Sequence, residues 1–498
     1  MSQPILRPQW SAAPSPFLHS WEGVGNIDQF RWFVRKDTQD QLAMARDELG
    51  LRHVRAVGMY DDELKALTND PALWRDNGDK RRTNWQVVDY CIRSLLDLGV
   101  NPMFTTSFMP QAMASRSCLV FNTANNTSPP KDWDAWSRFV RESVEHAVVM
   151  WGRDVVRNWY FEVWNEPNLG GREATGGFWG GNQEDFFRLW STTWRAIKSV
   201  DESFRVGGPS TARAEWIGDL IEYARKDGTP LDYLIGHCYN NDSASNPLSP
   251  FDGPQEDRVN TSIGFFNAVV RGTRKLLDQV GFRGEVHWNE WGRSWFPCDP
   301  PRETALEAAF AVRSMAEVSQ LGDRFAYWCL SDIYDQVGYQ NTAFCGHYGM
   351  LNLHGLRKPH YHAFQLLGRL GIQRVPVQGG DGLTDAIATS DGGRRALVYR
   401  HPVDFTDTVQ PGRVAVVVPE RPRHPRLFRI DRVDHNVISR WRDLGAPQYL
   451  DRTVLATLRS GNLLTAAPDS ACTISEHDGA WRVEFDLECP GVALLECD

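Results

Sequence analysis

An alternation of short apolar runs with longer amphipathic stretches is the feature that most constrains the fold. We count eight runs, each ending in Gly, Asn, Pro or another polar residue, near His19–Gly25, His53–Gly58, Pro102–Ser107, Trp159–Asn165, Phe204–Gly208, Tyr233–Tyr239, Glu285–Glu290 and Arg324–Leu330. Helical spacing lies between them, over Asp37–Leu49, Asn84–Leu98, Asp132–Trp151, Glu184–Val200, Thr211–Asp227, Asn260–Val280 and Glu303–Leu321. Eight strand–helix units are typical of a (β/α)8 barrel. A doubly wound sheet is the alternative, but the sequence lacks the glycine-rich phosphate loop it would need.

The pattern changes near residue 370, where helical spacing disappears and short strands alternate with Gly, Pro and Asp turns. We therefore predict a barrel over residues 19–368 and a β-sandwich over residues 369–498. The 498 residues suit two domains better than one. Residues 1–18 are rich in proline and small residues and read as an extended segment that could add a strand to the sandwich. The sandwich sequence contains no evident catalytic group, so a packing role is favoured over an independent binding role.

Composition excludes several classes of function. A net charge of −9 and a pI near 5.8 argue against a nucleic-acid partner. No stretch has the length and apolar character of a membrane span, and the first residues lack a signal-peptide core, so we expect a cytoplasmic protein without a membrane partner. The nine cysteines are scattered and form no CxxC pair, which favours free thiols. No ligand cluster of the usual spacing implies a metal or an organic cofactor, and no oligomeric state is predicted.

The fourth apolar run breaks in a way that places a carboxylate at a strand end. The run Trp159–Asn165 is followed by Glu166 and Pro167, and proline cannot continue a central strand. In a (β/α)8 barrel the carboxyl ends of the strands carry the catalytic groups. Glu166 is therefore a candidate proton donor to a leaving sugar oxygen. The competing interpretation is a structural salt bridge or a capping residue.

The seventh run supplies a partner for Glu166, because Glu290 also ends an aromatic strand and precedes a glycine by two positions. Strands four and seven face each other across the mouth of an eight-stranded barrel, so the two carboxyl groups could flank one sugar ring. Glycoside hydrolysis needs such a pair, with one carboxyl protonated and the other ionised. The residues alone leave open whether the pair retains or inverts the anomeric configuration, since this depends on the distance between the carboxyl groups.

Several motifs in the same order resemble glycoside hydrolase family 39, the family of β-xylosidases and α-L-iduronidases. The resemblance covers most of residues 17–370 and rests on Asp37–Gly58, Asn84–Ser115, Trp159–Leu169, Val206–Ser210, His237–Tyr239, Tyr327–Asp332 and Gly349–Ala363. It implies a retaining enzyme with Glu166 as acid/base and Glu290 as nucleophile. It also implies that Asn165 binds the sugar 2-hydroxyl and that His237 and Tyr239 position the sugar and the nucleophile. For His237 and Tyr239, simple core packing is the alternative.

Further candidates for the substrate pocket follow from the same resemblance. Phe108 and Trp328 would form apolar walls, although either could belong to the barrel core. Arg55 could orient a carboxylate or form a structural ion pair. Asp335 and Gln336 stand where family β-xylosidases usually carry two adjacent glutamates, and Val57 stands where they usually carry a sugar-binding histidine. These departures weaken the assignment of xylose, because polar mismatches change discrimination between sugars.

The leading hypothesis is thus a retaining, exo-acting glycosidase for a β-xyloside or a related pentoside, with a glycoside or oligosaccharide as its substrate. A uronic-acid hydrolase is an alternative that needs a cation for the sugar carboxylate, with Arg55, Arg172 and Arg293 as candidates. An endo-glycanase would need aromatic platforms, for which Trp179, Trp291 and Trp295 are candidates. A carbohydrate-binding protein on a glycosidase scaffold is the non-enzymatic alternative.

Overall fold

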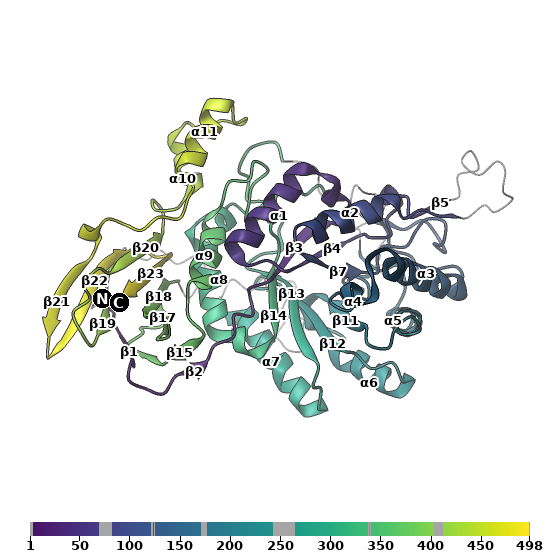
Figure 1. Ribbon diagram of the computed structural model, residues 1–498, viewed down its shortest axis with the longest axis horizontal. Coiled ribbons are helices and arrows are strands. Elements are labelled where there is room, and N and C mark those ends of the chain that lie inside the picture. The colour runs from purple at the N-terminus through teal and green to yellow at the C-terminus, as the bar shows by residue number, and fades with distance from the viewer. Residues whose placement is uncertain are drawn as a thin grey trace, which may run out of the picture.

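The computed structural model describes residues 3–68, 82–120, 123, 125–170, 177–242, 264–336, 338, 340–402 and 412–497. Figure 1 shows a barrel joined to a smaller unit of mostly antiparallel sheets, with the barrel at the right. The predicted (β/α)8 barrel with a C-terminal β-sandwich is confirmed. Residues 240–257 are rich in Asn, Ser, Pro and Gly, which favours a loop on the active-site face, and the structure describes them only as far as Asp242. Arg172 also lies outside the described residues.

Eight strands form the barrel, and each pairs in parallel with its neighbours. In chain order they are β3 (Val24–Gln29), β4 (His53–Val57), β7 (Asn101–Thr105), β10 (Tyr160–Glu162), β11 (Arg205–Thr211), β12 (Tyr233–Tyr239), β13 (Glu285–Gly292) and β14 (Arg324–Tyr327). Between β3 and β14 the ring is joined by Asn26, whose side-chain amide donates to the carbonyl oxygens of Asn289 and Ala326 at 2.6 and 3.2 Å. The strand ends therefore meet around one mouth.

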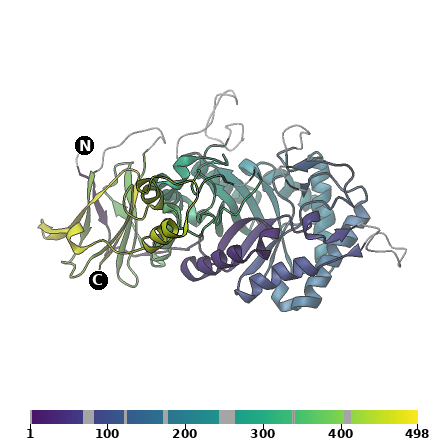
Figure 2. The same ribbon diagram turned by 90° about the horizontal axis from the view of Figure 1, so that it is seen from above.

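Helices cover the outside of this ring (Figures 1 and 2). They are α1 (Lys36–Leu49), α2 (Gln86–Asp97), α3 (Trp133–Trp151), α4 (Arg153–Val156), α5 (Gln183–Lys198), α6 (Ile217–Asp227), α7 (Gly264–Val280), α8 (Ala305–Val318) and α9 (Pro359–Gly368). Helix α1 ends where predicted, at Gly50, whose φ of 71° a glycine adopts without a steric penalty. Among the described helices, none combines the length and the apolar composition needed to cross a bilayer.

Short elements complete the barrel loops and the linking segments. They are the hairpins β5 (Leu67–Thr68) with β6 (Arg82–Thr83) and β8 (Leu119–Val120) with β9 (Asn125–Asn126), and the 3-10 turns η1 (Phe30–Val34), η2 (Asp62–Leu64), η3 (Ala212–Ala214), η5 (Pro300–Glu303), η6 (Ser319–Leu321) and η7 (Asp469–Ala471).

Two barrel elements differ from their predicted positions. The first strand was expected over His19–Gly25, but β3 begins only at Val24. The prediction missed it because β3 carries the buried polar residues Asn26, Asp28 and Gln29, which a search for apolar runs does not detect. The helix expected from Thr211 begins only at Ile217. The preceding backbone turns at Trp216, which has a φ of 60°, and this conformation cannot continue a helix.

The two sheets of the sandwich share an apolar interior. One sheet has the order β16 (Val377–Gln378), β1 (Ile5–Pro8), β19 (Gly412–Val418), β22 (Ala480–Leu487) and β21 (Thr473–His477). The other has the order β2 (Ser15–Pro16), β15 (Gln373–Val375), β17 (Thr384–Thr389), β18 (Arg394–Arg400), β23 (Gly491–Cys497) and β20 (Arg426–Ile430). The N-terminal strand β1 pairs with β19, so the chain starts in the sandwich, crosses to the barrel and returns. The outer face of the second sheet packs on α8 and α9 through Leu397, Phe428 and Leu494.

The expectation that helices end at residue 370 is wrong, since α10 (Val437–Asp443) and α11 (Arg452–Ser460) interrupt the sandwich. Helices of this length are marginal in isolation, which is why their sequence signal is weak. Their stability comes from packing: Val437, Ile438 and Leu458 bury against Phe344 and Leu356 in the segment that follows β14. In Figure 1 the two helices project above the sandwich toward the barrel.

Candidate active site

Glu166 is held at the mouth of the barrel by an unusual backbone path after β10. Trp164 and Glu166 have φ values of 67° and 44°, a region that non-glycine residues adopt at a cost. The backbone N–H of Glu166 donates to the carbonyl of Ser210 on β11 at 2.8 Å, which fixes the turn. The local strain therefore aims the Glu166 side chain into the mouth.

The carboxyl group of Glu166 is buried, and no cation of the described residues lies at contact distance from it. Its residue is 6% exposed, and Oε1 lies 3.1 Å from His237 Nδ1. Burial raises the pKa of Glu166 to about 7, against the opposing effect of the more distant Arg55 and Arg213. Burial also lowers the pKa of His237 to about 4, so its imidazole is neutral and offers no charge to Glu166.

Glu290 lies at the end of β13, where two donors reach its carboxylate. Arg55 Nη1 donates to Oε2 at 3.0 Å, and the Tyr239 hydroxyl donates to Oε1 at 2.7 Å. Burial raises the pKa of Glu290, with Glu166 adding to this effect, while Arg55 and Tyr239 act to lower it. The two direct donors favour the ionised form, which a nucleophile or a general base requires.

The structure brings the two predicted catalytic carboxyl groups together. One side-chain atom each from Glu166, His237 and Glu290 lies within 4.8 Å of the other two. This proximity favours the short carboxyl separation typical of retaining glycosidases over the long separation of inverting ones. The three atoms could also approach a metal ion, but the Arg55 guanidinium on Glu290 opposes a second cation there.

Asn165 and the predicted apolar walls also lie at this mouth. Asn165 is 4% exposed and its Oδ1 accepts from Arg55 Nη2 at 2.5 Å, which leaves its amide N–H groups for another acceptor. Phe108 is buried and packs edge-on against Trp164. Trp328 clusters with Tyr239 and with Tyr348 beside Glu290's strand.

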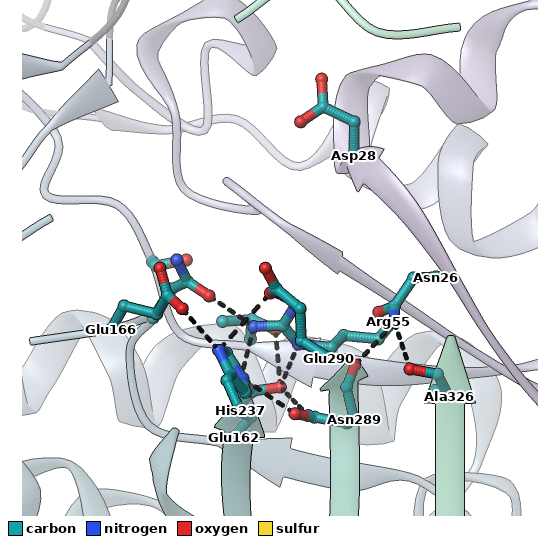
Figure 3. A network of polar contacts seen from close by, with 12 residues as sticks. Asn26, Asp28, Arg55, Glu162, Glu166, His237, Asn289, Glu290 and Ala326 are labelled. Carbon is teal, nitrogen blue, oxygen red and sulfur yellow. Dashed lines mark hydrogen bonds and ion pairs between the residues drawn. The ribbon is translucent and has the colours of Figure 1, made fainter. Parts of the chain in front are cut away.

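At the positions where this chain departs from the family pattern, the side chains either bond other residues of the protein or are buried. Gln336 Nε2 donates to Asp28 Oδ1 at 2.6 Å, and the Tyr334 hydroxyl donates to Gln336 Oε1. Asp335 pairs with Arg31 at 2.6 Å. Val57 is buried at the end of β4. Figure 3 shows Asp28 above the catalytic pair, toward the outer part of the mouth.

Two of the three arginines considered for a uronic acid, Arg55 and Arg293, lie in the described part of the chain, and both are held by carboxylates. Arg55 is fully buried and bonds Glu162 and Glu290. Arg293 bonds Glu307 at 3.0 Å and also contacts Asp299. Of the aromatic residues considered for an endo-acting cleft, Trp179 and Trp291 are fully buried and cannot serve as platforms, whereas Trp295 is 45% exposed.

Sequence reasoning missed three polar residues in this centre: Glu162, Asn289 and Asp28. Glu162 is fully buried, and Arg55 bonds both of its carboxylate oxygens at 2.8 Å. A signal was available, because Glu162 is a lone charge in an otherwise apolar strand and a buried charge needs a partner. Asn289 and Asp28 are also buried polar residues inside barrel strands.

Comparisons with known proteins agree with this geometry. The family model described as glycosyl hydrolases family 39 matches residues 11–468. A β-xylosidase of Caldicellulosiruptor saccharolyticus is 32% identical over 463 residues, covering 91% of this chain and 90% of the relative. A β-xylosidase of Geobacillus stearothermophilus is 28% identical over 494 residues, covering 97% of this chain and 93% of that protein. The crystal structure of a monomeric β-xylosidase from Caulobacter crescentus superposes with a TM-score of 0.82 at 26% identity, covering 99% of both chains.

Proposed function

The chain belongs to glycosyl hydrolase family 39 and is a glycoside hydrolase, and on this premise we propose that it is a retaining, exo-acting β-xylosidase with Glu166 as acid/base and Glu290 as nucleophile. One observation carries the assignment of roles. Glu290 accepts hydrogen bonds from the Arg55 guanidinium and the Tyr239 hydroxyl, whereas Glu166 faces a neutral imidazole. The two direct donors thus favour ionisation of Glu290, and Glu166 lacks such donors among the described residues.

The reaction follows in two steps. Glu290 attacks the anomeric carbon while Glu166 gives its proton to the departing oxygen, which leaves a sugar ester on Glu290. Glu166 then takes a proton from water, whose oxygen attacks the same carbon and releases Glu290 as a carboxylate. Because each displacement inverts the anomeric centre, the product keeps the configuration of the substrate.

Several groups support the first step besides the two glutamates. Arg55 touches both Glu290 and the Asn165 side chain, so it orients the nucleophile and the amide beside it. The amide N–H groups of Asn165 have no acceptor among the described residues, and they suit a sugar 2-hydroxyl next to the reacting carbon. Tyr239 keeps Glu290 in place before attack and can release it as the ester forms.

A pentoside is favoured over a uronic acid as the substrate. The two relatives that cover nine tenths of this chain are β-xylosidases by name. Within the described part of the chain, the candidate cations Arg55 and Arg293 already pair with glutamates, so neither is available to a sugar carboxylate. Asp28 with Gln336, above the catalytic pair, would read the outer hydroxyl groups of the sugar.

A panel of aryl glycosides tests this function. The sugars are β-xylose, α-arabinose, glucose, mannose, glucuronic acid and iduronic acid, and NMR follows the anomer released first. The proposal expects the highest kcat/KM for the β-xyloside, with β-xylose as the first product. A preference for a uronide would refute the substrate class, and α-xylose as the first product would refute retention.

A further inference from the structure

A continuous series of hydrogen bonds runs from Arg55 through the barrel to Glu166 (Figure 3). It begins with two parallel bonds from Arg55 to Glu162, from Nε to Oε2 and from Nη2 to Oε1, both 2.8 Å long. Burial alone would raise the pKa of Glu162, but the charge and hydrogen bonds of Arg55 bring it below its usual value. Glu162 is therefore a carboxylate, and its oxygens only accept hydrogen bonds.

This carboxylate determines which way the Asn289 amide faces. Asn289 Nδ2 lies 2.9 Å from Glu162 Oε2, and the reversed amide would place two oxygens at that distance. Oδ1 of Asn289 consequently faces His237 Nε2, also at 2.9 Å. Because Oδ1 only accepts, the proton of the imidazole must lie on Nε2.

The tautomer of His237 then determines its contact with the acid. The ring is fully buried and neutral, so with a proton on Nε2 its Nδ1 carries a lone pair. Nδ1 lies 3.1 Å from Glu166 Oε1 and 3.5 Å from Glu290 Oε2. A lone pair can bond Glu166 only if the carboxyl group brings the proton.

We propose that Glu162 and Asn289 hold His237 in the Nε2–H tautomer, so that Nδ1 accepts a hydrogen bond from the protonated carboxyl group of Glu166. This hydrogen bond keeps Glu166 protonated until substrate binds. The inference rests on the proposed role of Glu166 as the acid. Glu162, Asn289 and His237 are positioning residues here, because none of them exchanges a proton with the substrate. After Glu166 has given its proton to the leaving oxygen, its carboxylate faces the same lone pair, which favours recovery of a proton from water in the second step.

Other charged and titratable groups act on Glu166 as well, but none of them selects a tautomer. Arg55 and Arg213 favour the carboxylate, whereas Glu162 and Glu290 favour the protonated form. Asp242, Tyr239 and Tyr348 also lie close enough to interact with Glu166. The contribution of His237 differs from these because it depends on the direction of one hydrogen bond, from Nε2 to Asn289 Oδ1. A variant of Asn289 that removes this acceptor allows the imidazole proton to move to Nδ1.

The tautomer can be observed directly in the full-length protein labelled with 15N-histidine. The His237 signals are assigned by their loss in His237→Asn. The proposal expects Nε2 to be protonated and Nδ1 to be unprotonated near pH 6. A proton on Nδ1, or an imidazolium, would overturn it. Since this reading needs no turnover, it stands apart from the proposed function, which fails separately if the protein does not hydrolyse aryl β-xylosides.

A matched pair of variants tests the consequence for the acid. In Asn289→Ala the acceptor at Nε2 is lost, so the imidazole proton can move to Nδ1 and donate to the Glu166 carboxylate. The apparent pKa of the basic limb of the kcat/KM profile should then fall by about one pH unit. In Asn289→Asp the carboxyl oxygen that faces Glu162 must carry a proton, as the amide nitrogen does, and the other oxygen still accepts from Nε2. The basic limb of this variant should therefore stay where it is in the wild type. If Asn289→Ala lowers activity while its basic limb stays where it is in the wild type, Asn289 acts only in packing and the proposal is wrong.

Discussion

Two groups of buried charged side chains lie near the mouth of the barrel, and they differ in how the charges are matched. In the group around Lys358, the ammonium bonds Glu303 and Asp332 at 2.8 and 2.6 Å and also donates to the carbonyl of His347. In the group around Arg55, the guanidinium bonds Glu162 and Glu290, while Glu166 contacts only a neutral histidine among the described residues. We call these the Lys358 group and the Arg55 group.

This difference is the one expected between a structural group and the proposed catalytic group. Both acidic residues of the Lys358 group share one cation, the Lys358 ammonium, which contacts each of them directly. The Arg55 group pairs two of its three carboxyl groups and leaves the third with a pKa raised to about 7. An unpaired buried carboxyl is costly for folding, and it is useful where a proton must be transferred near neutral pH.

The largest expected effect is on turnover, in Glu290→Ala. Without its nucleophile the enzyme should lose at least about 10⁴-fold in kcat, as enzymes with covalent intermediates do. Its thermal unfolding should change little, because Arg55 keeps Glu162 as a partner. Added azide should restore some turnover and give a glycosyl azide of inverted configuration. Wild-type turnover in this variant would remove Glu290 from the mechanism.

Glu166→Ala should show a loss that depends on the leaving group. For substrates with poor leaving groups, removal of a general acid costs about 10²–10⁴-fold in rate. The aryl groups of activated xylosides depart without being protonated, so the first step of their hydrolysis should be affected far less. The measurement is kcat/KM across a series of aryl xylosides of increasing leaving-group pKa. An equal loss over the whole series would contradict the role as acid.

Lys358→Met tests whether the Lys358 group contributes to stability more than to activity. It leaves Glu303 and Asp332 buried without their cation, which should cost about 3–5 kcal/mol in the free energy of unfolding. Activity per folded molecule should fall much less than in either glutamate variant. Urea denaturation followed by tryptophan fluorescence measures the first quantity, and activity at low temperature measures the second. An unchanged denaturation midpoint would mean that the Lys358 group is not structural.

The smallest effect is on the pH profile of the wild-type enzyme. Glu166 must be protonated to act as acid, so kcat/KM should fall as pH rises through about 7. The decrease should approach tenfold per pH unit above that value. With an activated aryl xyloside, Glu166→Ala should lack this limb. Its persistence there would assign the limb to another group, such as Asp28, whose pKa burial also raises to about 7.

The sequence was sufficient to locate Glu166 and Glu290, because both stand at strand ends followed by Pro or Gly, and strand ends meet at one mouth in a barrel. It was not sufficient for β3, in which Asn26, Asp28 and Gln29 are buried, because a search for apolar runs does not detect buried polar residues. It also missed α10 and α11, which depend on contacts with Phe344 more than 90 residues earlier in the chain. The orientation of Asn289 depends on the distant Glu162 and so required the fold.

The most direct test of the account is to trap the sugar ester with an activated 2-deoxy-2-fluoro-β-xyloside and to map the label by mass spectrometry. The fluorine slows both steps, and the good leaving group keeps the first step fast enough for the ester to accumulate. We expect one label per chain, on the peptide that contains Glu290, and turnover regained as the ester hydrolyses. A label on Glu166, or an enzyme that stays unlabelled while it hydrolyses ordinary xylosides, would contradict the assignment of the two carboxyl groups.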